Sequence, residues 1–234
     1  LYYNDMSEVA DHMNRERNCY MRSEEILSKV DHTLLKPDAS WESIVRLCEE
    51  ALEYHTASVC IPPCYVKRVR ERFEKLVICT VIGFPLGYSV TAAKVAETAQ
   101  AVSDGADEID MVVNITDVKN HRYEEVENEI RAVREACREQ VLKVIVETCY
   151  LTEEEKIAVC GAVTKAGADY IKTSTGFGTA GASIEDVRLF REHIGPEVKI
   201  KAAGGIRTRE ALEAFLEEGC DRVGASCAVE LFRK

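Results

Sequence analysis

The chain has 234 residues, 46% of them hydrophobic and only 5 of them proline, which suits one well-packed domain. Its formal net charge of −11 argues against nucleic acid as a partner, although an acidic protein can still bind a phosphate where the positive potential is local. No apolar run approaches the roughly 20 residues that a membrane span needs, so no membrane partner is expected.

The first 25 residues mix charges throughout and lack the apolar segment of a signal peptide. We expect residues 1–28 to form a helical extension ahead of the main domain. The chain has ten cysteines. Several lie in apolar runs such as "SVCIPPC" and "VICTVIG", where a free thiol packs as a small hydrophobe. Buried thiols in a chain of this length indicate a reducing compartment, so a cytoplasmic location is expected.

Eight short β-branched runs alternate with helical stretches. The expected strands lie at 29–35, 57–62, 76–83, 108–115, 142–149, 170–174, 198–204 and 222–226. Most of these runs are continuously apolar, as is typical of parallel strands that are covered on both faces.

The segments between the strands carry helix signals. Ser89 is the expected N-cap of a helix that stops at Gly105. The expected apolar stripe of that helix is Ala92, Val95, Ala96, Ala99 and Val102. Thr152 and Glu155 have the spacing of a capping box. Further N-caps are expected at Ser183 and Thr208.

A weak internal repeat supports the number of strands. A glycine at 105, 167 and 219 begins a Gly-Ala-Asp or Gly-Cys-Asp triplet, two βα units apart each time. Glycine as a helix stop explains each triplet alone, but the spacing also places them before the fourth, sixth and eighth strands. Eight alternations in about 200 residues favour a single (β/α)8 TIM barrel over 29–234, with the extra N-terminal helix, rather than a doubly wound sheet.

Unusual polar residues fall at the carboxyl ends of the strands, where TIM barrels place their chemistry. Asp31 lies on the first strand, Asp110 on the fourth, Lys172 on the sixth and Lys201 on the seventh. A single lysine at a strand end is more often a side chain that extends to solvent. Two lysines that point into one barrel mouth disfavour each other's protonation, and a neutral amine can attack a carbonyl. Asp110 would be either a structural ion-pair partner or the proton-transfer group of an imine mechanism.

Glycine-rich loops follow the last three strands. They are "GFGTAG", "AGGIRT" and "GAS". Small residues let backbone N–H groups approach an anion, and TIM barrels often bind phosphate after their last strands. The histidines 32, 55 and 193 are isolated, and no CxxC, HExxH or tight Cys/His cluster occurs, so no metal site is expected. The residues therefore indicate a lysine-dependent carbonyl enzyme that needs no cofactor and acts on a small phosphorylated substrate.

Seven ordered motifs carry a family resemblance between about residue 26 and residue 230. They are "VDHTLLKPDAS", "VCIPP", "VIGFPLG", "GADEIDMVVNI", "KVIVET", "AGADYIKTSTGF" and "VKIKAAGGIRT". With these motifs the chain resembles the deoxyribose-phosphate aldolases, which are class I aldolases on a TIM barrel. The resemblance implies reversible cleavage of 2-deoxy-D-ribose 5-phosphate to acetaldehyde and D-glyceraldehyde 3-phosphate, in the breakdown of deoxyribonucleosides.

The resemblance also implies a role for each matching residue. Lys172 takes the position of the Schiff-base nucleophile. Lys201 takes that of the second lysine, which lowers the pKa of the nucleophilic amine and relays protons. Asp110 corresponds to the proton donor and acceptor, and Asp31 to a supporting aspartate near the second lysine. The positions that would hold the substrate and its phosphate are Thr173, Gly176, Gly204, Gly205 and Ser226. A homodimer is an expectation at the level of the family only.

One departure and two alternatives accompany this interpretation. Some family members end in a tail whose tyrosine reaches the active site, whereas no tyrosine follows Tyr170 here. Either a truncated tail or a shorter branch of the family would explain the difference. The alternatives are another lysine-dependent aldolase or transaldolase-like enzyme with a different donor, and a sugar-phosphate-binding barrel that has lost catalysis. The second alternative should have lost a lysine or the aspartate, and all three are present.

Overall fold

The computed structural model describes residues 21–233, whose strands close into one barrel. The strands follow one another in chain order around the barrel, and every neighbouring pair, β1 with β8 included, is parallel. Their bounds are β1 Val30–Thr33, β2 Ser58–Ile61, β3 Ile78–Ile82, β4 Glu108–Val112, β5 Val141–Ile145, β6 Tyr170–Lys172, β7 Lys199–Ala203 and β8 Arg222–Ala225. The predicted (β/α)8 barrel is confirmed.

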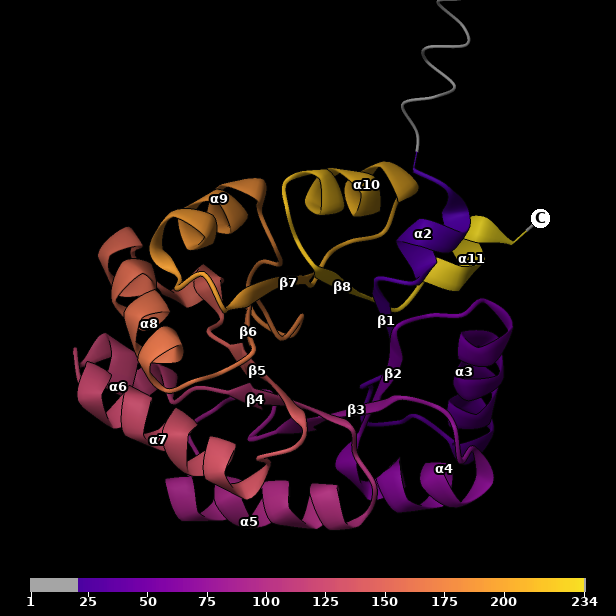
Figure 1. Ribbon diagram of the computed structural model, residues 1–234, viewed down its shortest axis with the longest axis horizontal. Helices are drawn as coiled ribbons and strands as arrows, with labels where there is room; N and C mark the ends of the chain where they lie inside the picture. Colours follow the sequence, from indigo (N-terminus) through magenta and orange to yellow (C-terminus); the bar gives the residue numbers. More distant parts are fainter. Residues whose placement is uncertain (1–20, 234) are drawn as a thin grey trace, which may run out of the picture.

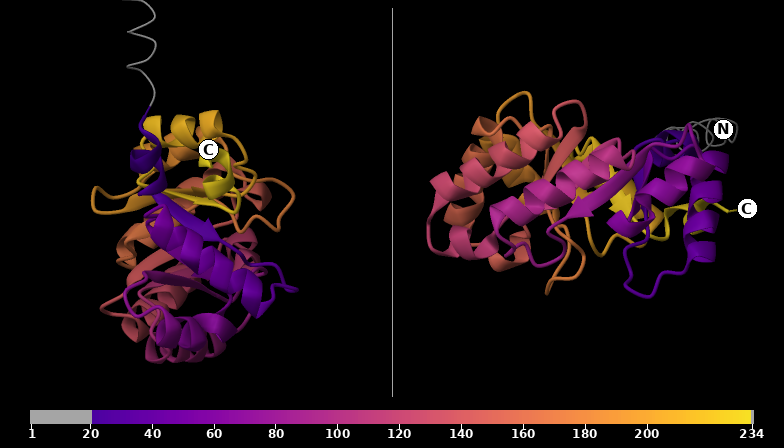
Figure 2. Two further views of the ribbon diagram at one scale, coloured as in Figure 1. Left: turned by 90° about the vertical axis from the view of Figure 1, so that its right-hand side faces the viewer. Right: turned by 90° about the horizontal axis from the view of Figure 1, so that it is seen from below.

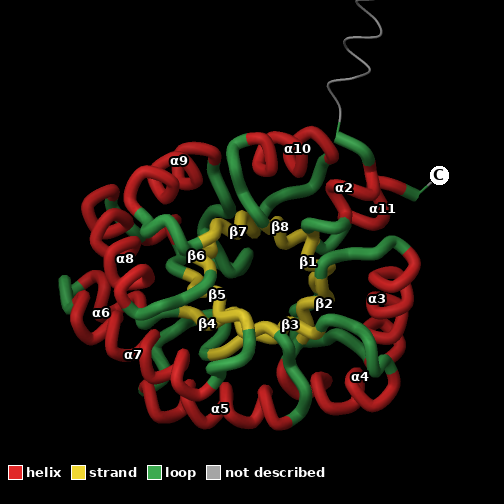
Figure 3. The backbone as a smooth tube through the Cα atoms, in the orientation of Figure 1, coloured by secondary structure: helices red, strands yellow, loops and turns green. Residues whose placement is uncertain are grey.

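Helices enclose the strands as an outer ring (Figures 1 and 3). The longer helices are α3 Trp41–Glu53, α4 Val66–Arg72, α5 Thr91–Ser103, α7 Tyr123–Ala136, α8 Glu153–Lys165, α9 Ile184–His193 and α10 Arg209–Glu217. The shorter ones are α2 Ser23–Leu27, α6 Ile115–Lys119 and α11 Ala228–Phe232, with 3₁₀ turns η1 Pro63–Tyr65 and η2 Thr148–Tyr150. Within the described part of the chain, no helix is long and apolar enough to cross a membrane.

The expected helical extension over 1–28 falls mostly on residues 1–20, which lie outside the described residues. Of that extension the structure describes α2, whose Ile26 and Leu27 are buried in the core. Helix α2 packs against α10 and α11, so the first and last described helices lie side by side (Figure 2).

Three of the predicted helix starts are confirmed. The Thr152 hydroxyl accepts from the backbone N–H of Glu155, and the Glu155 side chain accepts from the N–H of Thr152, which completes the capping box. Ser183 and Thr208 cap α9 and α10 in the same way, each accepting from a backbone N–H three residues later. These bonds satisfy N–H groups that the helix itself cannot pair.

The predicted start and stripe of α5 are wrong. The N-cap residue is Val90, which provides no side-chain cap, and Ser89 lies one residue before it. The residues that α5 buries are Lys94, Thr98 and Ala101. Of the predicted stripe, Val95 and Val102 are partly buried and pack against the core, whereas the three alanines are exposed. A buried ion pair on Lys94 turns this face of the helix inward, and an apolar pattern contains no signal for such a pair.

The Gly-x-Asp repeat has a structural explanation. Gly105, Gly167 and Gly219 have φ values of +101°, +74° and +103°, and they end α5, α8 and α10 before β4, β6 and β8. Each following aspartate accepts the N–H of the first or second residue of the preceding strand. The pairs are Asp107 with Ile78, Asp169 with Leu142, and Asp221 with Ile200, at 2.8, 2.7 and 3.1 Å. The repeat therefore ties the segments that lead into β4, β6 and β8 to the strands before them, at the amino end of the barrel.

The strands end earlier than predicted at the other end of the barrel. Strand β6 stops at Lys172, and the hydroxyl of the next residue, Thr173, donates to the Ala203 C=O at 3.2 Å and accepts from the Ala203 N–H at 3.1 Å. In the ladder between β6 and β7, Lys172 is the direct partner of Lys201. The register therefore brings these two lysines to the same height in the barrel.

Candidate active site

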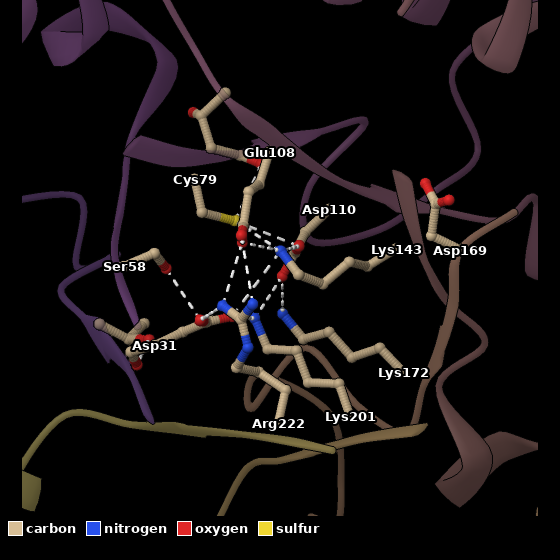
Figure 4. A network of polar contacts seen from close by, with 12 residues as sticks. Asp31, Ser58, Cys79, Glu108, Asp110, Lys143, Asp169, Lys172, Lys201 and Arg222 are labelled. Carbon is tan, nitrogen blue, oxygen red and sulfur yellow. Dashed lines mark hydrogen bonds and ion pairs between the residues drawn. The ribbon is translucent and has the colours of Figure 1, made fainter. Parts of the chain in front are cut away.

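Every strand of the barrel contributes a polar side chain to one buried cluster. Its members are Asp31 (β1), Cys60 (β2), Cys79 (β3), Glu108 and Asp110 (β4), Lys143 (β5), Lys172 (β6), Lys201 (β7) and Arg222 (β8). Figure 4 shows Asp110 between the amine ends of the three lysines. Burial makes unpaired charge costly, so the contacts among these groups determine which of them can react.

Asp110 is the centre of the cluster and is completely buried. Its Oδ2 accepts from Lys172 Nζ and from Lys201 Nζ, both at 2.7 Å. Its Oδ1 accepts from Lys143 Nζ at 2.8 Å and from Cys79 Sγ at 3.1 Å. Burial alone would raise the pKa of Asp110, but the three lysines hold that pKa well below its usual range. Asp110 therefore rests as a carboxylate.

Asp31 holds Lys201 from the other side. It accepts from Lys201 Nζ, from Arg222 NH1 at 2.5 Å and from Ser58 Oγ at 2.8 Å. Burial opposes ionisation of Asp31, yet Lys201 and the other cations lower its pKa below the ordinary value. Burial would likewise lower the pKa of Lys201, but Asp110 and Asp31 outweigh it and raise that pKa. Lys201 therefore stays charged, clamped between two carboxylates.

Lys172 differs from the other two barrel lysines in bordering a pocket of about 370 Å³. The pocket is lined by the carboxyl ends of four strands and the loops that follow them: 33–36 at β1, 172 and 175–177 at β6, 203–207 at β7, and 224–226 at β8. No other member of the buried cluster lines it. A molecule in the pocket can therefore reach the Lys172 amine. Asp110, which contacts that amine, and Lys201 lie behind it, away from the pocket.

The glycine loops form another part of the pocket wall. Gly176, Gly204 and Gly205 line it with φ values of +85°, +87° and +76°, and Ser226 lines it after β8. A Cβ on Gly204 would lie 3.1 Å from the Cα of Gly181 and 3.3 Å from that of Gly176. Glycine at 204 thus permits both the backbone conformation and the close approach of the loops after β6 and β7. Thr173 does not line the pocket, since its hydroxyl is bonded to Ala203.

Two groups of three metal-ligand side chains lie within the cluster, although the spacing of the cysteines in the sequence gives no sign of them. They are Cys60, Cys79 and Asp110, and Asp31, Cys79 and Glu108, with ligand atoms within 4.8 Å of one another. Their carboxylates already accept from lysine and arginine, whose positive charges oppose a further cation. The donor set therefore fits ammonium groups better than a metal ion.

Comparison with known proteins places this barrel in a family. Residues 26–231 match the model of the DeoC/LacD family aldolases. A protein of Clostridium botulinum (strain Alaska E43 / Type E3) named deoxyribose-phosphate aldolase is 63% identical over 214 residues, which cover 91% of this chain and 97% of that protein. The chain belongs to the DeoC/LacD aldolase family.

Other relatives of this aldolase agree. A protein of the same name from Clostridioides difficile (strain 630) is 54% identical over 209 residues, covering 89% of this chain and 95% of the relative. The solved deoxyribose phosphate aldolase of Aeropyrum pernix, whose structure is described as a unique tetramer, has a TM-score of 0.85 at 29% identity and covers 95% of each chain. The family resemblance seen in the sequence motifs is confirmed.

The structure of this aldolase brings together the four residues expected to carry the chemistry, and adds others that the sequence analysis missed. Lys143, Glu108 and Arg222 belong to the same ion-pair cluster. A usable signal existed for Lys143, which interrupts the apolar run "VLKVIV" as Lys172 interrupts its own strand. Glu147, also missed, is buried with a φ of +55° and accepts from the Thr175 N–H at 3.1 Å and from the Thr175 hydroxyl. It fixes the loop that follows Lys172.

Proposed function

We propose that this aldolase reversibly cleaves 2-deoxy-D-ribose 5-phosphate to acetaldehyde and D-glyceraldehyde 3-phosphate through an imine on Lys172. The observation that carries the proposal is the placement of Lys172, the one barrel lysine that both borders the pocket and contacts Asp110. Relatives at 54–63% identity are named for this activity, and they do not favour a different donor or an inactive binding barrel.

In the synthetic direction, the neutral amine of Lys172 attacks the carbonyl carbon of acetaldehyde. Loss of water gives a protonated imine, which withdraws electrons from the methyl carbon. That carbon loses a proton and becomes an enamine, which forms the new C–C bond with the aldehyde carbon of glyceraldehyde 3-phosphate, whose oxygen gains a proton. Water then hydrolyses the imine and frees Lys172.

Asp110 and Lys201 serve the proton transfers in this scheme. Both lysine amines contact the same oxygen of Asp110, so a proton leaving Lys172 meets an acceptor at 2.7 Å that is itself bonded to Lys201. The lysines hold the pKa of Asp110 well below its usual range, so Asp110 rests as a carboxylate between the two amines. Asp31 supports the relay by fixing Lys201.

The glycine loops after β6, β7 and β8 would hold the phosphate. Gly176, Gly204, Gly205 and Ser226 line the pocket, and the cationic side chains of Lys36 and Arg207 border it as well. Such a site gives local positive potential to a chain that is acidic as a whole. Thr173 supports these loops through its bonds to Ala203 rather than through the pocket.

Two further parts of the proposal concern the setting of the enzyme. The nine cysteines among the described residues are free thiols, which supports a reducing cytoplasm. We also propose a homodimer, by analogy with the family alone. Light scattering coupled to size exclusion tests that assignment, and a monomer at micromolar concentration would contradict it.

Borohydride trapping with acetaldehyde, followed by peptide mass mapping, tests the reaction. We expect an ethyl group on Lys172. A label on Lys201 instead would exchange the roles of the two lysines and keep the reaction class. A folded protein with no label at all would overturn the imine mechanism.

A further inference from the structure

Lys143 is a third lysine inside the barrel, fully buried and away from the pocket. Its Nζ lies 2.6 Å from Glu108 Oε2, 2.8 Å from Asp110 Oδ1 and 3.7 Å from Asp31 Oδ2. Cys79 Sγ is 3.3 Å away. The scheme above gives Lys143 no task, although it shares Asp110 with the lysine that reacts.

The charges of the buried cluster do not balance when every member has its usual charge. The cations are Lys143, Lys172, Lys201 and Arg222, and the anions are Asp31, Glu108 and Asp110, which leaves one positive charge in excess. Excess charge in a dry interior is costly, and loss of one proton from one lysine removes it. The cluster is therefore balanced when one of its lysines is neutral.

The contacts decide which lysine loses the proton. Lys143 has carboxylates on three sides and Lys201 has two of them, whereas Lys172 has only Asp110, whose Oδ2 it shares with Lys201. Lys172 also borders the pocket, where a released proton can reach water. Lys172 thus has the fewest carboxylate partners of the three lysines, and it is also the one whose proton can leave through the pocket.

We propose that Lys143 is a positioning residue for the aldol reaction that keeps Lys172 neutral. Its positive charge pairs with Asp110 and Glu108, so these carboxylates do not need a second positive charge from Lys172. The proposal rests on the imine function of Lys172. Lys143 touches no substrate in this scheme and acts through the carboxylates that it pairs.

Groups from every strand around Lys172 enter this balance. They are Asp31, Cys60, Cys79, Glu108, Asp110, Lys143, Tyr170, Lys201 and Arg222. Burial opposes the charge on Lys143, but Asp110 and the other anions raise its pKa well above the usual value, so it stays charged. Burial raises the pKa of Cys79, while the hydrogen bond with Cys79 lowers that of Cys60. The excess of one positive charge holds when both thiols are protonated, and Cys60→Ser tests this condition. An unchanged pH dependence supports it, whereas a midpoint that moves down would mean that a Cys60 thiolate supplies the fourth anion and would overturn the inference.

The experiment measures the rate of imine formation with acetaldehyde against pH, trapped by borohydride, in the full chain. Lys143→Met removes one cation, so the cluster balances with Lys172 protonated. We expect the midpoint of the acid limb to rise by at least about one pH unit, which lowers the rate about tenfold on that limb and restores it at alkaline pH. Lys143→Arg keeps the charge and should keep the wild-type midpoint.

Glu108 offers a matched compensation, because it pairs Lys143 and Arg222 and does not line the pocket. Glu108→Gln removes one anion and should move the midpoint down. The double variant Lys143→Met/Glu108→Gln removes one charge of each sign and should return the midpoint towards the wild-type value. A role in packing alone predicts no such opposite shifts.

Three further results would overturn the inference. One is a folded Lys143→Met enzyme that loses rate equally at all pH values without a midpoint shift. Another is a double variant whose midpoint stays with that of Lys143→Met. If Lys143→Met does not fold, Glu108→Gln decides alone, and an unchanged midpoint rejects the proposal. Failure of the proposed function looks different, since the wild type would then trap no ethyl group on Lys172 at any pH.

Discussion

Lys94 and Lys172 are both buried lysines that donate to a carboxylate, one outside the barrel and one inside it. Lys94 Nζ, on α5, donates to Glu129 Oε2 at 2.9 Å and to the Val112 C=O at 2.8 Å. The same Glu129 oxygen accepts from the Asn114 N–H at 3.0 Å, so the pair joins α5, α7 and the end of β4. Lys172 instead shares its one carboxylate with two other lysines and faces a pocket.

The pKa shifts of the two regions run in opposite directions. Burial lowers the pKa of Lys94 and raises that of Glu129, because one partner compensates only part of the lost hydration. In the barrel, the facing charges outweigh burial, which lowers the pKa of Asp31 and Asp110 and raises that of Lys201. The Lys94–Glu129 pair ties together parts of the structure and its charges match one to one, whereas the barrel cluster has one more cation than anions and includes an amine that borders a pocket.

The comparison predicts its largest effect on activity. Lys172→Met should lower kcat/KM for cleavage by on the order of 10⁴-fold, because neither of the other two lysines inside the barrel, Lys143 and Lys201, borders the pocket. A coupled assay for glyceraldehyde 3-phosphate measures it. Lys94→Met is the matched control and should retain the kcat of the folded enzyme. If the Lys172→Met variant still formed a trapped adduct with acetaldehyde, the distinction between Lys172 as the reactive lysine and Lys94 as a structural one would be wrong.

The largest effect on stability is expected from the other lysine. Lys94→Met leaves Glu129 buried without its cation, so the free energy of unfolding in urea should fall by about 3–5 kcal/mol. Lys94→Met/Glu129→Leu removes both charges and should recover most of that loss. If the double variant were as unstable as the single one, the loss would reflect packing rather than an unpaired carboxylate.

Lowering the pH should change the free energy of unfolding in opposite directions through the two regions. Asp31 and Asp110 have folded pKa values below the unfolded value of 3.8, so they bind fewer protons in the folded state. Their contribution to stability is present above that value and is lost as the pH falls towards the folded pKa, by up to about 1.4 kcal/mol per pH unit for each proton. The raised pKa of Glu129 acts the other way, since protonation at low pH relieves a cost.

Urea unfolding between about pH 3 and pH 7 tests these signs. Asp31→Asn should flatten the acid loss of stability, and Glu129→Gln should steepen it. Equal slopes in the wild type and both variants would show that neither carboxylate controls acid stability.

The smallest effect concerns a neutral neighbour of Lys94. Thr98 Oγ1 donates to the Lys94 C=O at 2.8 Å within α5 and is buried. Thr98→Val keeps the shape and removes this bond, so the free energy of unfolding should fall by about 1 kcal/mol or less, with kcat unchanged. A loss similar to that of Lys94→Met would mean that packing on this face of α5, rather than charge, determines its stability.

Much of the fold could be predicted because each strand and its following helix carry local signals. The alternation of β-branched runs with capped helices is visible in the sequence, and the Thr152 capping box and the Gly105, Gly167 and Gly219 stops need no distant partner. The prediction of the buried face of α5 failed because that face depends on a distant partner. Its inward face is decided by Glu129, which lies 35 residues away on another helix.

The site was predictable only in part for the same reason. Lys172 and Lys201 stand out because each interrupts an apolar strand near a glycine loop, and Asp110 because its strand is otherwise apolar. The contacts of Lys143 depend on the stagger of eight strands around a closed barrel, and this stagger is not written in any one segment. All three lysines interrupt apolar strands, so the sequence alone does not show which of them reaches the pocket.

The contacts of Asp31 have a consequence for the order of folding. Its cationic partners Lys201 and Arg222 are 170 and 191 residues away along the chain, across the seam where β8 meets β1. These contacts join the first strand to the seventh and eighth, so they can form only when the ring of strands closes. The contacts that fix Lys201 therefore depend on closure of the ring, and we expect aldolase activity to appear only once the barrel has closed.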